Sequence, residues 1–159
     1  TTSKDEQGRK TVIDLVPNNP TVVACGRLDA ASRGLVLLTN DGEVCYQITH
    51  PKFGHQKEYQ VVATINSGPP IEERIDRLCE SIDLDGYQTL PAKVSAIKRK
   101  GMELSFNITL SEGRNRQIRR MCSAVGLDVV DLCRTKIDKL TLFPTLEGQW
   151  RRVKREEIV

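Results

Sequence analysis

A strict alternation of apolar and polar side chains over residues 102–110 constrains the fold of this chain more than any other feature. Every second position there is apolar: Met102, Leu104, Phe106, Ile108 and Leu110. Because successive side chains of a β-strand point to opposite faces, this period of two predicts a strand rather than a helix. A strand of this kind requires neighbouring strands to pair with it.

Further segments with strand character occur along the whole chain. Residues 57–65 (KEYQVVATI) are rich in β-branched side chains, and residues 34–39 (GLVLLT) form an uninterrupted apolar run. The second pattern predicts a strand that is buried on both faces. The other predicted strands cover residues 21–25, 88–100, 128–134, 137–143 and 149–153.

Three helices are expected between these strands. Asn40 followed by Glu43 resembles a capping box and predicts a helix over residues 41–49. A second helix follows Pro70, and a third is predicted over residues 114–125. On the second helix, one face is shared by Ile71, Ile75, Leu78 and Cys79. Because strand pairs mix with a few helices and lack a regular βαβ rhythm, the predicted class is α+β with a mixed, largely antiparallel sheet.

Composition sets outer limits on what the chain can be. Its 159 residues fit one domain, and no segment approaches the roughly 18 apolar residues that span a bilayer. The net charge of +3 is too small to indicate a polyanionic partner by itself. Five widely spaced cysteines include no CxxC pair, so we expect no zinc site, no disulfide framework, and a cytoplasmic protein with reduced thiols.

The first segment with chemical potential is Gly26-Arg27-Leu28-Asp29, which lies between two predicted strands. Loops held by rigid strands often present reactive side chains, and a carboxylate here can act as base, nucleophile or ligand. Alternatively, Asp29 caps a turn or pairs with Arg27 or Arg33, which is a common use of Asp in turns. The spacing alone favours this structural role.

The second segment is strongly basic and runs from Glu112 to Met121. It contains four arginines: Arg114, Arg116, Arg119 and Arg120. Helical geometry places Arg116 and Arg120 opposite the apolar side, with Arg119 at the border between the two faces. Such a patch can bind a polyanion or can simply be a solvated helix face.

The third segment is Lys57-Glu58-Tyr59. Aromatic residues make up only 4% of the chain, which is few for a protein that grips single-stranded nucleic acid on several stacking platforms. One tyrosine that stacks on one base is compatible with this count. Tyr59 taken alone is more simply explained as a cross-strand surface residue.

Taken together, these segments closely resemble the RsuA-like family of pseudouridine synthases, which isomerise uridines in ribosomal RNA. The matching blocks are GRLDAASRGLVLLTNDG, KEYQV, EGRNRQIRRM and VVDLCRTKIDKLTL, in this order. The similarity runs from about residue 11 to the stretch ending at Arg151. The implied fold is the shared catalytic core of these enzymes, a long mixed sheet with helices flanking an active-site cleft.

The resemblance also implies roles for particular residues. Asp29 matches the essential aspartate, Tyr59 the tyrosine that stacks on the target base, and Arg119 the basic residue that pairs with the aspartate. The expected substrate-binding residues are Arg27, Leu132, Arg134, Arg116, Arg120, Asn115 and Lys57. Among these, Leu132 resembles the residue that closes the pocket under the base, and Arg27 the one that holds the nucleotide outside the RNA helix.

The chemistry of the residues agrees with this assignment. The reaction breaks an N–C glycosidic bond and rejoins the base through carbon, and a carboxylate can either attack the sugar or promote elimination at it. No redox or phosphoryl-transfer step occurs, so we expect neither a cofactor nor a metal. The expected partner is RNA, with ribosomal RNA first and transfer RNA second; we expect no membrane partner and a monomeric protein.

Two family features are missing from the sequence. Nothing resembles the small S4-type RNA-binding domain that many members carry before the catalytic region, and the strand with a Lys-Pro-x-Gly pattern is absent. The first residue is Thr rather than Met. We therefore expect residues 1–159 to form a single catalytic domain that lacks its extreme N-terminal strand.

Two other functions compete with this one. A non-catalytic RNA-binding or ribosome-assembly factor could use the same fold, although all the matched catalytic positions are present. A glycoside hydrolase would need two facing carboxylates, and the sequence offers no comparable partner for Asp29.

Overall fold

The computed structural model describes residues 6–17 and 21–158. The α-helices are α1 (Gly42–Thr49), α2 (Ile71–Cys79) and α3 (Gln117–Ala124), and the short 3-10 helices are η1 (Val12–Leu15), η2 (Pro51–Phe53) and η3 (Arg155–Glu157). The strands are β1 (Val23–Cys25), β2 (Arg33–Gly34), β3 (Leu37–Thr39), β4 (Lys57–Ile65), β5 (Asp83–Leu84), β6 (Tyr87–Gln88), β7 (Lys93–Lys100), β8 (Glu103–Leu110), β9 (Leu127–Ile137) and β10 (Leu140–Thr141).

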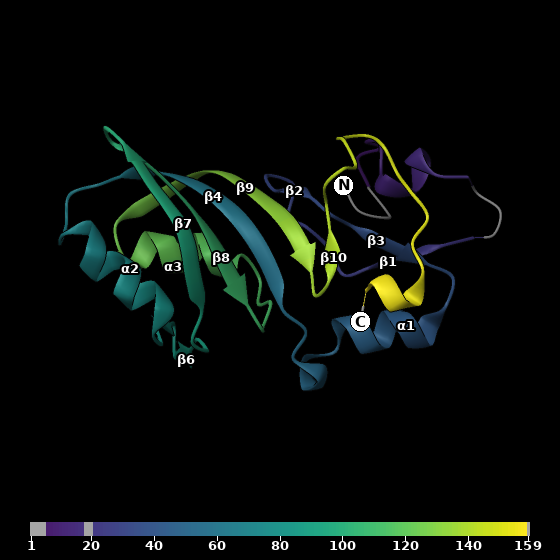
Figure 1. Cartoon of the computed structure of the whole chain (residues 1–159), viewed down its shortest axis with the longest axis horizontal. Coiled ribbons are helices and arrows are strands. Elements are labelled where there is room, and N and C mark those ends of the chain that lie inside the picture. The colour runs from purple at the N-terminus through teal and green to yellow at the C-terminus, as the bar shows by residue number, and fades with distance from the viewer. Residues whose placement is uncertain (1–5, 18–20, 159) are drawn as a thin grey trace.

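One six-stranded sheet organises the molecule (Figure 1). Its strands follow the order β10-β9-β4-β8-β7, and every neighbouring pair along this path is antiparallel. The short strand β2 adds to β9 in parallel. The sheet is therefore mixed and largely antiparallel, which confirms the predicted α+β class.

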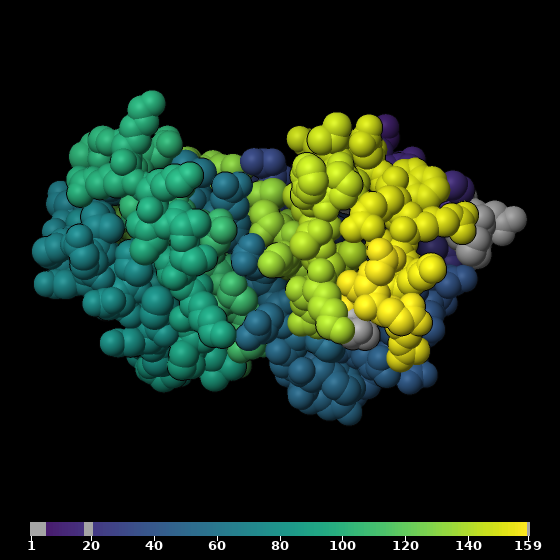
Figure 2. Space-filling model, viewed as in Figure 1, coloured from purple at the N-terminus to yellow at the C-terminus, as the bar shows by residue number. Residues whose placement is uncertain are grey.

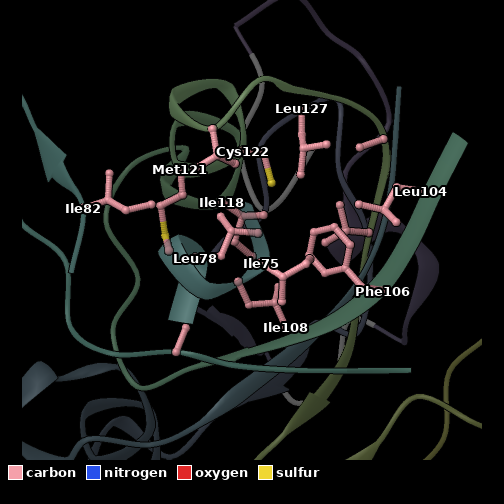
Figure 3. Close-up of a cluster of buried hydrophobic side chains, with 14 of the residues drawn as sticks. Ile75, Leu78, Ile82, Leu104, Phe106, Ile108, Ile118, Met121, Cys122 and Leu127 are labelled. Carbon is pink, nitrogen blue, oxygen red and sulfur yellow. The ribbon is translucent and has the colours of Figure 1, made fainter. Parts of the chain in front are cut away.

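The larger of two hydrophobic cores lies between this sheet and helices α2 and α3 (Figure 3). Four alternate residues of β8 are buried in it: Leu104, Phe106, Ile108 and Leu110. The alternation that predicted this strand therefore arises because one face of β8 packs against the core. Met102 does not take part, because it precedes β8 and is 59% exposed. The predicted apolar face of α2 is also confirmed, with Ile75 and Leu78 buried.

A second, smaller core joins the N-terminal third of the chain to its C-terminal segment. It contains Cys25, Leu37, Ile48, Ile137, Leu140 and Ile158. Strand β9 contributes to both cores, because Leu127 and Leu132 lie in the larger core and Ile137 lies in the smaller one. The two lobes in Figure 2 are thus linked through one continuous strand.

The apolar run over residues 34–39 is not one strand, contrary to the prediction. Arg33 and Gly34 form β2 in the large sheet, whereas Leu37 to Thr39 form β3 and pair with β1 in a separate two-stranded sheet. The chain therefore crosses from one sheet to the other within this run. An apolar sequence reports burial, and both halves of this run are largely sheltered from solvent in different surroundings.

Several predicted boundaries also differ from the structure. The predicted strand over residues 88–100 is divided into β6 and β7, the region 137–143 keeps only β10 as a separate strand, and residues 149–153 form no strand. Helix α1 is capped by Asp41 rather than Asn40, because Asp41 Oδ1 accepts hydrogen bonds from the amides of Glu43 and Val44. Within the described residues, no helix has the length and apolar character needed to cross a membrane.

Candidate active site

Asp29 lies in the loop that connects β1 to β2, as its position between two apolar segments predicts. The end of this loop is fixed against the large sheet. Leu35 donates its amide to the Arg134 carbonyl at 2.9 Å, and Arg134 Nε donates to the Leu35 carbonyl at 2.9 Å. Gly34 permits this contact, because a Cβ atom there would lie 2.3 Å from the Arg134 carbonyl oxygen. Backbone packing between β2 and β9 therefore positions the loop that carries Asp29.

The Asp29 carboxylate is held by residues from its own loop and from α3. Ser32 Oγ donates to Asp29 Oδ1 at 2.8 Å, and Arg119 Nε donates to Oδ2 at 3.2 Å. Arg119 also donates through Nη2 to the Ala31 carbonyl and to Ser32 Oγ. The ion pair between Asp29 and Arg119 that the resemblance implies is thus present. Ser32 was missed by the sequence analysis, although a serine three residues after an aspartate is a common turn spacing.

A second arginine also contacts the carboxylate. Arg116 Nη1 lies 3.2 Å from Asp29 Oδ2. Helical periodicity predicts Arg116 on the outer face of a helix, and this prediction is wrong because α3 begins at Gln117. Arg116 is instead the N-cap residue, with a left-handed φ of 50°. This backbone conformation redirects its half-exposed side chain toward Asp29.

These contacts keep Asp29 ionised. Partial burial opposes ionisation, but the hydrogen bond from Ser32 and the positive charge of Arg119 outweigh it, with a further contribution from Arg116. The pKa of Asp29 is consequently below its usual value. The site therefore holds a negatively charged carboxylate that remains 28% exposed.

Tyr59 and Lys57 come from β4, on the other side of β9 from Asp29's loop. Tyr59 is paired with Arg134 of β9, and Gly34 of β2 is paired with the same residue from the opposite side. Two strand spacings therefore separate Tyr59 from Gly34, or about 10 Å. Tyr59 is partly buried and packs against the larger core. Burial and the nearby Arg134 lower the pKa of Lys57, while Asp138 opposes this effect.

Leu132 and Arg134 are both enclosed in the protein. Leu132 lies opposite Val61 in the β4–β9 pair and belongs to the larger core. Arg134 is 3% exposed, and its Nη2 group is buried without a hydrogen-bond partner among the described residues. In this structure, Arg134 serves the site through its contacts with Gly34 and Leu35.

The remaining predicted substrate-binding residues lie at the protein surface. Arg27 is exposed in the loop before Asp29, and Asn115 is exposed in the turn that precedes α3. Arg120 donates to Asp85 Oδ2 at 3.1 Å, and this aspartate is almost fully exposed. Arg114 contacts a different side chain, with its guanidinium carbon 3.3 Å from the centroid of the Tyr87 ring.

No cluster of three or more His, Cys, Asp or Glu side chains suited to a metal ion occurs in the described part of the chain. All five cysteines are free. A cavity of about 510 Å³ exists in the smaller lobe, but neither Asp29, Tyr59 nor Arg119 lines it. The candidate site is therefore the partly exposed surface around Asp29 rather than this cavity.

Comparisons with known proteins identify the family of the chain. The family model described as RNA pseudouridylate synthase matches residues 1–124. Ribosomal large subunit pseudouridine synthase E of Vibrio parahaemolyticus is 36% identical, with 94% of this chain and 67% of that protein covered. Ribosomal large subunit pseudouridine synthase B of Bacillus subtilis is 37% identical, with 98% and 64% covered.

Two further comparisons bear on length and fold. The dual-specificity RNA pseudouridine synthase RluF of Escherichia coli is 37% identical over 99% of this chain, but this chain spans only 52% of that protein. A crystal structure of a pseudouridylate synthase superimposes with a TM-score of 0.81 and 35% identity, with 93% of this chain and 64% of that one covered. The fold is shared by a chain of an archaeal box H/ACA Nop10-Cbf5 complex. The two chains are 15% identical and superimpose with a TM-score of 0.54, with 77% of this chain and 40% of that one covered.

The matched family model covers most of the chain and includes the loop of Asp29, strand β4 with Tyr59, and helix α3 with Arg119. These are the segments that carry the resemblance in the sequence. The chain therefore belongs to the RNA pseudouridylate synthase family.

Proposed function

We propose that this chain is the catalytic part of an RNA pseudouridine synthase that acts through Asp29. The observation that carries the proposal is the ionised Asp29 carboxylate, oriented by Ser32 and Arg119 and still partly open to solvent. In the reaction, the N1–C1′ bond of uridine breaks and a C5–C1′ bond forms. The C5 hydrogen is released and N1 gains a proton. Asp29 either attacks C1′ or promotes elimination at the sugar.

The other residues have distinct proposed roles. Tyr59 stacks on the target base, and Leu132 forms the apolar floor beneath it. Arg119 keeps Asp29 charged and fixes its orientation. Arg27 helps to hold the flipped nucleotide outside the RNA helix, which compensates for lost base stacking.

A group of basic and polar side chains is proposed to contact the RNA backbone. It comprises Arg116, Arg120, Asn115 and Lys57. Arg116 also affects Asp29 directly, because its guanidinium forms an ion pair with Asp29 Oδ2. An RNA phosphate that draws Arg116 away would leave Arg119 as the one arginine on this oxygen and make the carboxylate more accessible to the sugar. For the buried Arg134 we propose an indirect role, in which it binds the Asp29 loop to β9.

The proposed substrate is ribosomal RNA, since two of the relatives are described as ribosomal large subunit synthases. Transfer RNA is the second proposed substrate class. We further propose that residues 1–159 act as one monomeric catalytic domain in the cytoplasm, and that the chemistry needs neither metal nor cofactor. Because this chain spans between 52% and 67% of the relatives above, these statements concern the catalytic region only.

Tritium release tests the proposed reaction. RNA labelled with tritium at C5 of uridine loses the label to water when the C5–C1′ bond forms. We expect release from one class of ribosomal RNA, either mature or still unprocessed, to a limit of one site per molecule. Binding of RNA without any release from all fractions would instead favour a non-catalytic RNA-binding or assembly factor on the same fold.

A further inference from the structure

Aromatic side chains gather on the surface immediately before β4. The whole chain has only seven Phe, Tyr and Trp residues and two histidines, yet both histidines lie within residues 46–55 together with Tyr46 and Phe53. Ring centroids are 5.0 Å apart for Tyr46 and His50, 5.7 Å for Tyr46 and Phe53, and 6.1 Å for Phe53 and His55. We call these four rings the aromatic platform. It is open to solvent, because Tyr46 is 46% and Phe53 is 40% exposed.

A cation is positioned on this platform. Lys52 Nζ lies 4.9 Å from the centroid of the Phe53 ring and 5.2 Å from that of the Tyr46 ring. The ammonium lies over these rings, so a base that stacks on Phe53 takes its place while the ammonium moves to the attached phosphate. The rings can stack on a base of any identity, while the ammonium can pair with the attached phosphate.

The platform is also held in place before any ligand binds. His50 Nδ1 accepts a hydrogen bond from the Lys52 amide, and His55 Nδ1 contacts the carboxylate of Asp138 in the turn after β9. Two further bonds join the same turn to Gln56, at 2.9 Å and 2.8 Å. The carboxylate of Asp138 is thereby engaged by His55 and Gln56. A preformed surface loses little conformational freedom on binding, so its contacts contribute more fully to affinity.

Its position in the chain limits how far the platform can lie from Tyr59. Phe53 ends helix η2 and precedes Tyr59 by six residues. A chain of that length spans at most about 22 Å between Cα atoms. Figure 1 shows this blue segment at the lower edge of the molecule, between β4 and α1. In Figure 2, the blue surface at the same lower edge contains this segment together with α1.

We propose that the aromatic platform binds an unpaired nucleotide that flanks the target uridine, with its base stacked on Phe53 and its phosphate paired with Lys52. This inference rests on the proposed action on RNA. It adds a second contact outside the Asp29 site, and this contact reads single-stranded character rather than base identity. The platform thus favours targets in loops and bulges over targets in continuous duplex.

Anisotropy titrations with two labelled probes test the platform. One probe is a short oligouridine strand, and the other is an abasic ribose-phosphate strand of equal length. Phe53→Leu removes the aromatic ring but keeps an apolar side chain of similar size. We expect this variant to bind oligouridine at least about fivefold more weakly, as for the loss of one stacked base, and to bind the abasic strand like the wild type.

Lys52→Gln and two further variants complete the design. Lys52→Gln should weaken binding of both strands and reduce the magnitude of the salt slope by about 0.7. Phe53→Trp should restore oligouridine affinity. Phe143→Leu is the matched control, because Phe143 is 83% exposed and is not one of the four rings of the platform; we expect no change in binding.

Unchanged oligouridine affinity in Phe53→Leu would overturn the proposal that the platform binds a nucleotide. An equal loss of affinity for both strands would also overturn it. A platform that binds a protein rather than RNA would give the first of these results. These outcomes remain separate from the fate of the proposed reaction, because tritium release is measured on the wild type. A wild type that releases no tritium would refute the reaction, whatever the oligouridine titrations show.

Discussion

At the scale of single residues, Asp29 carries the proposed chemistry. Asp29→Asn keeps the shape of the side chain and its hydrogen bond from Ser32 but removes the charge. We expect tritium release to fall at least about a hundredfold, while RNA binding stays within about threefold of wild type. Asp85→Asn is the matched control, since Asp85 also pairs with an arginine but is 96% exposed and outside the proposed reaction. Loss of cooperative thermal unfolding in Asp29→Asn would instead make Asp29 a structural residue.

The charge state of Asp29 gives a prediction about pH. Its pKa is lowered in the folded protein, so its stabilising charge is present above the unfolded pKa of about 3.9 and is lost as pH falls through the folded value. Replacing Arg119 removes a cause of this lowering. In Arg119→Gln, the acidic limb of the pH–rate profile should therefore move to higher pH.

Single-turnover tritium release across the acidic range measures this limb. Arg33→Gln is the control, because Arg33 binds Asp131 rather than Asp29, and its acidic limb should stay in place. An Arg119→Gln profile that is lower but unshifted would mean that Arg119 acts on position alone.

The residues around Asp29 show which contacts a sequence can predict. The pairing of Asp29 with Arg119 follows from the family resemblance of two separated blocks. The contact from Arg116 does not, because a helix drawn through residue 116 points this side chain away from Asp29. The helix begins one residue later, and the left-handed φ of Arg116 reverses its direction. Hydrophobic periodicity in the sequence does not predict such a change of backbone conformation at the end of a helix.

At the scale of elements, the contact between β2 and β9 positions the Asp29 loop. Gly34 has a φ of 118°, and a Cβ atom there would lie 2.3 Å and 2.5 Å from backbone atoms of Arg134. We expect Gly34→Ala to lower the free energy of unfolding by about 1–3 kcal/mol and to reduce tritium release more than tenfold, because β2 must move. Gly42→Ala is the control, since a Cβ there meets nothing within 4 Å.

Thermal melting and tritium release are measured on both glycine variants. Gly42→Ala should equal the wild type in release and match or exceed it in stability, because alanine favours a helix more than glycine does. A Gly34→Ala protein with wild-type release would show that the loop does not depend on this close approach.

Helix α3 gives the second prediction at this scale. Arg120 is 38% exposed and pairs only with the exposed Asp85 among the ion pairs described. If it contacts a phosphate, Arg120→Gln should reduce the magnitude of the salt slope of RNA binding by about 0.7. Arg151→Gln is the control, because Arg151 is 34% exposed, pairs with Glu157 and lies in the smaller lobe. Equal slopes for both variants would remove Arg120 from the RNA interface.

At the scale of the whole molecule, the strand pairing that matters most for the site is non-local. Strand β2 pairs with β9 across about a hundred residues of chain, at Arg33 with Cys133 and at Gly34 with Arg134. Hydrophobic periodicity predicts that strands exist, and it predicted β4 and β8 within a residue or so of their ends. It does not determine partners. The apolar pattern of residues 34–39 predicts that they are buried. It does not predict that they are divided between two sheets.

Because β9 contributes to both cores, we expect the two lobes to unfold as one cooperative unit. Leu140 is 3% exposed in the smaller core, so Leu140→Ala should cost about 2–4 kcal/mol and lower Tm by roughly 5–15 °C. Val130→Ala is the control on β9 itself, since Val130 is 59% exposed, and should cost less than about 1 kcal/mol.

Two probes then report on different parts of the molecule. Fluorescence of Trp150, the single tryptophan of the chain, follows the smaller lobe, where it lines the cavity with Leu37 and Leu140. Far-ultraviolet circular dichroism is dominated by the large sheet and its helices. Coincident transitions in Leu140→Ala, both shifted to lower temperature, would show that the smaller core stabilises the strands that hold Asp29 and Tyr59 together. If the fluorescence transition preceded the dichroism transition, the lobes would be separate units, and the Asp29 loop could detach while Tyr59 and Arg119 stayed folded.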